Sequence, residues 1–107
     1  MADLGGIQNA PLTAYQQHIR QVMVERGFDD ETVSQKFMLL LEQAGEFAQA
    51  ARKQANLAQS TDASIEDCSD AAADVFAVLL DICNQMSINL EQAFIAREYK
   101  NQDRTWQ

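Results

Sequence analysis

The sequence predicts an all-α protein built as a bundle of about four helices. Only 4 glycines and 1 proline occur in the 107 residues, so few residues are available for the turns that strands require. Long stretches rich in Ala, Gln, Leu and Glu favour helix, and apolar residues recur in them at helical spacing. The length suits one compact domain and is too short for two, so we expect a single domain over residues 1–107.

The first helix is expected from about Pro11 to Arg26. Residues 1–8 show no apolar period, and we interpret them as a loose tail. Asn9 can cap the helix, and Pro11 then falls in the first turn, where its missing N–H leaves no intrahelical bond unmade. Arg26–Gly27 is a stop signal. The apolar face consists of Tyr15, Ile19, Val22 and Met23.

The second helix is expected to run from an acidic first turn, Asp29–Glu31, to about Ala55. One continuous apolar stripe predicts its buried face. Arg52 and Lys53 lie near its end, where cations are favoured. The polar segment 56–64 is expected to form the following loop. The stripe comprises Phe37, Leu40, Leu41, Ala44, Phe47, Ala48 and Ala51.

The third helix is expected over Ile65–Met86 and is broken by Ser87–Asn89. Asn89 with Gln92 three residues later resembles a capping box, which opens a short fourth helix to about Glu98. Residues 99–107 are polar and are expected to form a tail. The apolar stripe of the third helix comprises Cys68, Ala72, Val75, Phe76, Leu79, Leu80, Cys83 and Met86.

The composition excludes several classes of function. A net charge of −8 disfavours direct nucleic-acid binding, because phosphate backbones repel an acidic surface. No apolar run reaches the roughly 18 residues of a membrane span, and the chain opens without the basic and apolar regions of a signal peptide. Cys68 and Cys83 lie about 22 Å apart along one expected helix, so they cannot pair with each other. Free thiols suit a reducing compartment, and we expect a cytoplasmic protein.

Two acidic pairs are the candidate functional residues. Glu42 and Glu46 share a flank of the second helix, and Asp70 and Asp74 share a flank of the third. Solvated helix faces usually mix the two signs of charge, yet no Lys or Arg occurs within residues 56–96. Acids on half-buried faces repel one another unless a cation lies between them. The residues alone leave two interpretations open: a metal site, or two solvated acidic faces.

Magnesium is the metal that fits these acids best. Mg²⁺ takes oxygen ligands, retains water and often shares its coordination with substrate phosphates. Zinc would need Cys or His ligands, and His18 is the only histidine. A di-iron bundle would need Glu-x-x-His pairs, which one histidine cannot supply. Asp81 falls on the same expected flank as Asp74, and Gln17 and His18 are expected either at the surface or beside a base pocket.

Four segments, in their order and spacing, resemble the all-α NTP pyrophosphohydrolases, the MazG-like group related to the all-α dUTPases. The resemblance covers about Tyr15 to Trp106. Members of this family are helical bundles that form dimers or tetramers. They hold Mg²⁺ on an E-E-x-x-E motif of one helix and an E-x-x-D motif of the next, and cleave nucleoside triphosphates between the α and β phosphates. The matching segments are Leu41–Lys53, Asp74–Cys83, Ile88–Phe94 and Lys100–Asn101 with Arg104 and Trp106.

The resemblance implies roles for individual residues of this chain. The expected metal ligands are Glu42, Glu46, Asp70 and Asp74. Asp70 stands one residue before the position of a family ligand rather than at it, and Glu42 and Glu46 are also implied to be catalytic. The implied substrate-binding residues are Lys53, Lys100, Asn101 and Arg104; Lys53 alone also suits a helix C-terminus. Gln43 and Ala71 stand where the family has Glu.

The expected function is therefore Mg²⁺-dependent hydrolysis of an NTP or dNTP to a monophosphate and pyrophosphate. The expected partners are the nucleotide and further copies of the chain, in an intertwined dimer or a dimer of dimers, with no nucleic acid and no membrane. The altered motif leaves an alternative: a non-catalytic nucleotide-binding or helical interaction protein with the same fold. A bundle whose acidic faces are merely solvated stays the third interpretation.

Overall fold

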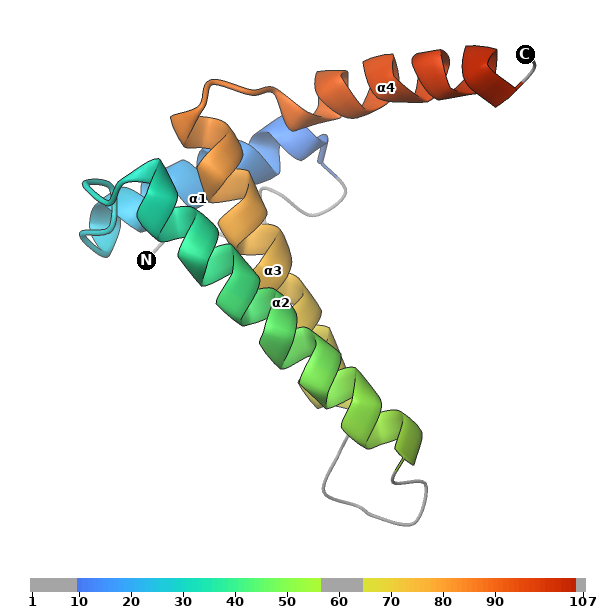
Figure 1. Ribbon diagram of the computed structural model, residues 1–107. Coiled ribbons are helices and arrows are strands. Elements are labelled where there is room, and N and C mark those ends of the chain that lie inside the picture. The colour runs from blue at the N-terminus through green and yellow to red at the C-terminus, as the bar shows by residue number, and fades with distance from the viewer. Residues whose placement is uncertain (1–9, 57–64, 106–107) are drawn as a thin grey trace.

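The computed structural model describes residues 10–56 and 65–105. These residues form four helices and no strand, so the all-α prediction is confirmed. Figure 1 shows α2 and α3 side by side as a long antiparallel hairpin, with α1 packed across α3 and α4 projecting from that end. The predicted tail 1–8 and the loop residues 57–64 lie outside the described ranges. The helices are α1 (Leu12–Glu25), α2 (Val33–Asn56), α3 (Ile65–Gln85) and α4 (Leu90–Thr105).

Two helices end in the same hydrogen-bonded motif. At the end of α1, the Phe28 N–H donates to the Met23 carbonyl (2.9 Å) and the Gly27 N–H to the Val24 carbonyl (3.1 Å). Gly27 has a φ of 76°, which a residue without Cβ adopts freely. These are the two bonds of a Schellman motif, so the predicted stop at Arg26–Gly27 is confirmed.

The end of α3 repeats this motif without a glycine. The Ile88 N–H donates to the Cys83 carbonyl (2.8 Å), and the Ser87 N–H to the Asn84 carbonyl (3.3 Å). Ser87 takes the left-handed position with a φ of 58°. A residue with a Cβ is strained in this conformation, so the turn between α3 and α4 contains a strained backbone position.

The helix starts agree only partly with the prediction. Asn89 caps α4 as predicted, accepting the Gln92 N–H at 3.1 Å. The prediction that Asp29–Glu31 form the first turn of α2 is wrong, because α2 begins at Val33, after these acids. Thr32 caps it instead: its hydroxyl accepts the Gln35 N–H (3.1 Å), while the Gln35 side chain accepts the Thr32 N–H (2.8 Å). Pro11 is the cap residue of α1 rather than part of its first turn, and makes no side-chain capping bond; Asn9 lies outside the described residues.

The fourth helix is longer than predicted. It continues through Thr105, so the prediction of a polar tail from Tyr99 is wrong for residues 99–105. This stretch contains neither Gly nor Pro, and Lys100, Gln102 and Arg104 are good helix formers. The extra turns carry three of the predicted substrate-binding residues on a rigid helix.

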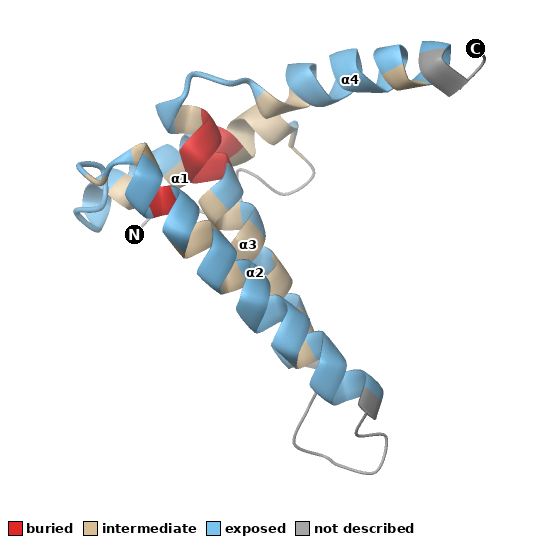
Figure 2. Ribbon diagram, viewed as in Figure 1, coloured by how far each residue is buried: buried red, intermediate tan, exposed pale blue. Residues whose placement is uncertain are grey.

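The buried core is small and lies where α1 crosses α3 (Figure 2). Leu80 is 1% exposed, and Val22, Ile82 and Cys83 complete the buried apolar set among the described residues. Away from this crossing the hairpin is at most half-buried. The predicted stripe of α2 is not its packed face: Leu40 is half-buried, whereas Phe37, Leu41, Ala44, Phe47, Ala48 and Ala51 are exposed.

The chain is extended for its size. Its radius of gyration is 16.6 Å, against about 13 Å for a compact domain of this length. Within the described ranges no single helix is long and apolar enough to cross a membrane; α3 and α4 reach that length and composition only as a pair, and they are bent by 96° relative to each other. This bend directs α4 away from the α2–α3 hairpin (Figure 1).

Candidate functional site

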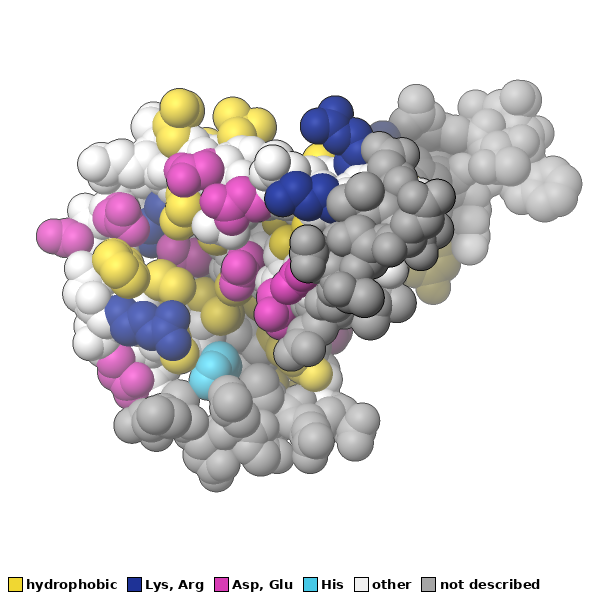
Figure 3. Space-filling view, turned by 90° about the horizontal axis from the view of Figure 1, so that it is seen from below, with side chains coloured by type: hydrophobic (Ala, Val, Ile, Leu, Met, Phe, Trp, Pro, Cys, Tyr) yellow, Lys and Arg dark blue, Asp and Glu magenta, His cyan; other side chains and the backbone are white. Residues whose placement is uncertain are grey.

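The four predicted metal ligands all lie exposed on the hairpin. Glu42 and Glu46 are on α2, and Asp70 and Asp74 are on α3. Figure 3 shows acidic side chains interspersed with hydrophobic ones on the face seen from below. Among the described residues no group of three or more acids, cysteines or histidines is close enough to hold a metal ion.

Two contacts define the register of the hairpin. Lys36 Nζ donates to Asp81 Oδ1 at 3.0 Å near one end, and the Cys68 thiol donates to Gln54 Oε1 at 3.0 Å near the other. The two helices rise equally per residue, so the first contact puts position 71 opposite Glu46 and the second puts position 76 there. Asp74 lies between these two positions, and Asp70 lies one turn further along α3. Of the four acids, Glu46 and Asp74 are therefore the pair from the two helices that comes closest to the same level.

The ion pair between Lys36 and Asp81 shows that the expectation for Asp81, a place on the acidic flank with Asp74, is wrong. Asp81 is only 8% exposed and is not part of a solvated acidic flank. Lys36 is 3% exposed and extends across the hairpin to meet it. Burying both charges in contact removes Asp81 from the set of acids available to a metal.

Gln43 is the most unusual polar residue of the hairpin. Its side-chain Oε1 is fully buried, and it has no hydrogen-bond partner among the described residues. An unmade hydrogen bond of this kind costs about 1–3 kcal/mol. Gln43 is also the residue that stands in place of the second Glu of the expected metal motif. The unmade hydrogen bond therefore destabilises the same segment of α2 in which the metal ligands were predicted.

The predicted substrate-binding residues are divided between two places. Lys53 is exposed in the last turn of α2. Lys100 is exposed and Asn101 half-buried on α4; Arg104 also lies on α4, with its side chain outside the described structure. Because α4 packs on α1 and points away from the hairpin, one chain does not bring the α4 residues to the acids (Figure 1).

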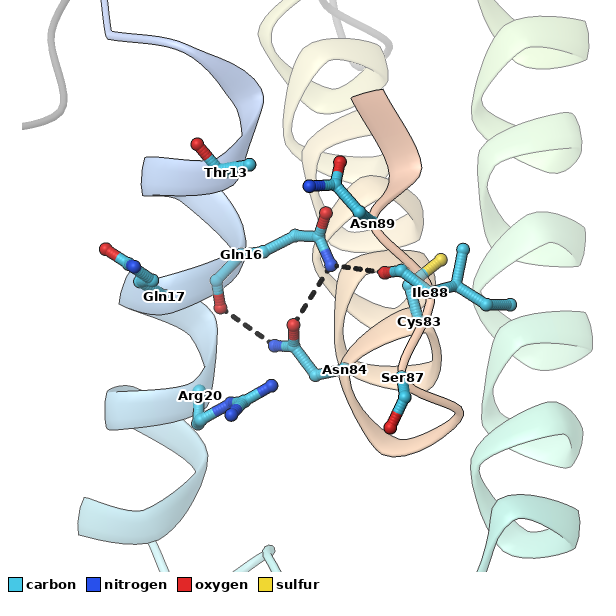
Figure 4. A pocket seen from close by; sticks show the side chains of 9 residues that line it. All are labelled: Thr13, Gln16, Gln17, Arg20, Cys83, Asn84, Ser87, Ile88 and Asn89. Carbon is cyan, nitrogen blue, oxygen red and sulfur yellow. Dashed lines mark hydrogen bonds between the residues drawn. The ribbon is translucent and has the colours of Figure 1, made fainter. Parts of the chain in front are cut away.

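A buried amide clasp joins α1 to the turn before α4, and the sequence analysis missed it. Gln16 is 7% exposed. Its amide nitrogen donates to Asn84 Oδ1 (3.1 Å) and to the Ile88 carbonyl (2.9 Å), while its oxygen accepts the Leu90 N–H (2.9 Å). The Asn84 amide returns a bond to the Gln16 carbonyl (2.8 Å). Figure 4 shows the two side chains facing each other between the helices.

This clasp forms a wall of a pocket of about 340 Å³ between α1 and the α3–α4 turn. Arg20 and Gln17 line it, and Figure 4 shows Arg20 directed toward the α3 side. His18 is not among its lining residues. The Gln16 amide nitrogen already donates two hydrogen bonds within the protein, so Gln16 here joins α1 to the α3–α4 turn. A hint was present in the sequence: Gln16 precedes Ile19 by three residues and so shares the inward face of α1.

Cys83 also borders this pocket, and burial raises the pKa of its thiol. A thiol with a raised pKa stays protonated at neutral pH, and the thiolate is the nucleophilic form. Cys83 is therefore a small apolar wall residue, as expected. A second contact ties α4 to α1 nearby, where Glu91 Oε1 accepts the Leu12 N–H at 2.8 Å.

Comparison of the chain with models of known protein families, with curated proteins and with solved structures gives no match. The functional argument therefore depends on the residues of this chain and their arrangement.

Proposed function

We propose that this chain is a Mg²⁺-dependent nucleoside triphosphate pyrophosphohydrolase of the MazG-like type. The observation that carries the proposal is the hairpin register, which puts Asp74 of α3 within about one turn of Glu46 of α2. Glu42 precedes Glu46 by one turn, and Asp70 follows Asp74 by about one turn along the hairpin axis. We call these four carboxylates of two antiparallel helices the acidic strip.

The donor set suits magnesium. All four residues offer carboxylate oxygens, the ligands that Mg²⁺ prefers, and their exposure leaves room for the waters that Mg²⁺ retains. Bound Mg²⁺ would neutralise the triphosphate and activate a water for attack on the α-phosphorus. Glu42 and Glu46, with Asp70 and Asp74, would hold the metal.

The positively charged residues of the chain would bind the substrate. Lys53, at the end of α2, would bind phosphate oxygens beyond the acidic strip. Lys100, Asn101 and Arg104 would orient the phosphates and the sugar. Catalysis would depend on this positioning and on charge stabilisation rather than on a protein nucleophile.

Pyrophosphate release tests the proposal. The protein is incubated with Mg²⁺ and a panel of NTPs and dNTPs, and both products are quantified. Glu46→Gln should abolish release, because it removes a carboxylate without changing the size of the side chain. Asp30→Asn is the matched control: Asp30 is also exposed and lies outside the strip, so this variant should keep full activity. Equal activity in the Glu46→Gln variant and the parent would refute the site.

A second candidate is a non-catalytic protein that binds nucleotide or another protein through the same fold. It is favoured by the exposure of all four acids and by Gln43 at the second motif position. This candidate predicts that Mg²⁺ with nucleotide raises the melting temperature while no nucleotide is cleaved. A protein on which Mg²⁺ and nucleotide have no effect would instead have two solvated acidic faces.

The assembly that we propose is an intertwined dimer or a dimer of dimers in the cytoplasm. Support comes from the exposed apolar side chains: Leu41 is 68% exposed, and Phe37, Met38, Phe47 and Phe76 are also exposed on the hairpin. Exposed apolar side chains of this size are typical of a face that another subunit covers.

A further inference from the structure

The pocket between α1 and the α3–α4 turn has a charge that is unusual for so acidic a chain. Its volume of about 340 Å³ is within the range of small-molecule sites. The chain has 16 acidic residues and a net charge of −8. Among the described residues that line this pocket there is no Asp or Glu, and Arg20 is the one charged side chain. The local charge of the pocket therefore favours an anion.

The amide oxygens of the pocket wall already accept hydrogen bonds within the protein. Gln16 Oε1 accepts the Leu90 N–H at 2.9 Å. Asn89 Oδ1 accepts the Gln92 N–H at 3.1 Å. Asn84 Oδ1 accepts a hydrogen of the Gln16 amide at 3.1 Å. A backbone N–H can only donate, so the bonds to Leu90 and Gln92 determine which atom of each amide is the oxygen.

The nitrogens of the same pocket still have hydrogens to donate. Asn84 Nδ2 gives one hydrogen to the Gln16 carbonyl (2.8 Å) and keeps the other. Among the described residues, no acceptor is bonded to the Asn89 amide nitrogen or to the Arg20 guanidinium. Figure 4 shows Asn89 directed toward α1 and Arg20 directed toward the α3 side. A wall whose amide oxygens are occupied and whose nitrogens can donate favours a ligand that accepts hydrogen bonds.

We propose that this pocket binds a small molecule through an oxyanion, which is a phosphate or a carboxylate group. Arg20 binds the oxyanion, because the planar fork of its N–H groups matches two oxygens of either group. Asn84 and Asn89 donate their unused hydrogens to the ligand. The lining extends along α1 from Thr13 to Arg20, about 10 Å, so the pocket also has room for the organic part of the molecule.

This site is separate from the acidic strip. Asn84 and Asp74 both lie on α3, about 15 Å apart along its axis, so anion binding in the pocket does not depend on nucleotide hydrolysis at the hairpin. A ligand held by Arg20 of α1 and by Asn89 before α4 joins the same two parts that the Gln16 clasp joins. Because the unfolded chain has no such pocket, the ligand should raise the melting temperature.

Titration of the full chain, followed by ¹H–¹⁵N NMR, tests the site. The probes are inorganic phosphate and succinate at neutral pH, each compared with sodium chloride at equal ionic strength. We expect saturable shifts of the Asn84 and Asn89 side-chain amides and of the Arg20 Nε–H. Saturation by phosphate, by succinate or by both supports the site and indicates whether its ligand carries a phosphoryl group, a carboxylate or either. Shifts no larger than those with sodium chloride overturn the proposal.

Two arginine variants form a matched pair. Arg20→Gln and Arg26→Gln each remove one exposed positive charge, the first within α1 and the second at its C-cap, but only Arg20 lines the pocket. Arg20→Gln should weaken binding at least about tenfold, because it removes the charge-assisted hydrogen bonds. Arg26→Gln should change the affinity less than about twofold, since salt screens a charge outside the pocket. Equal affinities of the two variants would overturn the proposal.

Ser87 provides a second pair from the other side of the pocket. It lines the pocket, and its left-handed backbone, with a φ of 58°, is one that Asp and Asn both adopt. Ser87→Asp adds a carboxylate that repels the ligand, so it should weaken binding at least about tenfold. Ser87→Asn has nearly the same size without the charge and should bind as the parent does. Circular dichroism checks that both variants fold, and indistinguishable affinities of the two overturn the proposal.

Discussion

Breaking the Lys36–Asp81 pair should be the most destabilising polar substitution in the hairpin. The two side chains touch at 3.0 Å and are 3% and 8% exposed as residues. Replacing Lys36 with Met removes the positive charge and keeps the length of the side chain, so Asp81 is left buried without its partner. Removal of one member of a buried pair typically costs about 3–5 kcal/mol. We expect a loss of about 3 kcal/mol, since the site lies near the edge of the hairpin.

The double variant separates this explanation from simple loss of packing. Lys36→Met with Asp81→Leu replaces both charges with apolar groups, which is often neutral or stabilising. Its free energy of unfolding should lie within about 1 kcal/mol of the parent, although each single variant loses much more. Urea unfolding at one fixed protein concentration measures all four proteins, because self-association would otherwise change the apparent stability. Additive losses, or a single loss below about 1 kcal/mol, would refute the reasoning.

Four further substitutions or reactions have defined outcomes. Gln43→Met should raise the free energy of unfolding by about 1 kcal/mol in urea, because it removes a buried oxygen that has no partner. Ser87→Gly should also stabilise, by up to about 1 kcal/mol, by relieving the left-handed backbone. Gln16→Leu should cost at least about 2 kcal/mol, since it leaves the Ile88 carbonyl and the Leu90 N–H unpaired. Burial raises the pKa of Cys83, so a thiol reagent at pH 8 should label it more slowly than Cys68, and equal rates in single-cysteine variants would contradict this. Because the unfolded Cys83 thiol ionises at lower pH than the folded one, its contribution to stability should fall as pH rises above the ordinary thiol pKa.

The helix boundaries that local chemistry determines could be predicted from the sequence. The stop at Gly27 and the cap at Asn89 depend on a few adjacent residues, and both are confirmed. The start of α2 was missed because two local signals compete there. The acids at 29–31 suit a helix N-terminus by charge, but the reciprocal bonds of Thr32 and Gln35 satisfy backbone donors directly and determine the boundary.

Interactions between distant residues could not be predicted in the same way. Lys36 and Asp81 are separated by 45 positions, and no pattern within either helix indicates that one meets the other. Gln16 and Asn84 are separated by 68 positions. Gln16 shares the inward face of α1, but nothing within α1 or α3 indicates that the two amides meet. Such pairs depend on the register and crossing of whole helices, and these are properties of the packed structure.

In the candidate site too, local features could be predicted from the sequence and contacts between helices could not. The spacing of Glu42 and Glu46 indicates a shared flank, and the absence of cations on α3 indicates unbalanced charge; both are local facts. Which acids lie near each other is a matter of register, and only the two cross-hairpin contacts show that Asp74 lies within about one turn of Glu46. The direction of α4 depends on the turn at Ser87, a strained position that composition does not reveal.

The predicted apolar stripe of α2 is not the face that packs on α3. Lys36, Gln43 and Ala50 are seven residues apart and share one face. With Val33, Leu39 and Leu40 they are the buried or half-buried positions of α2 among the described side chains. The more apolar side, with Phe37 and Leu41, is exposed. An amphipathic pattern identifies an apolar side but does not identify what covers it. The exposed apolar residues of α2, and those of α4, are therefore the surfaces that the proposed assembly of several chains would cover.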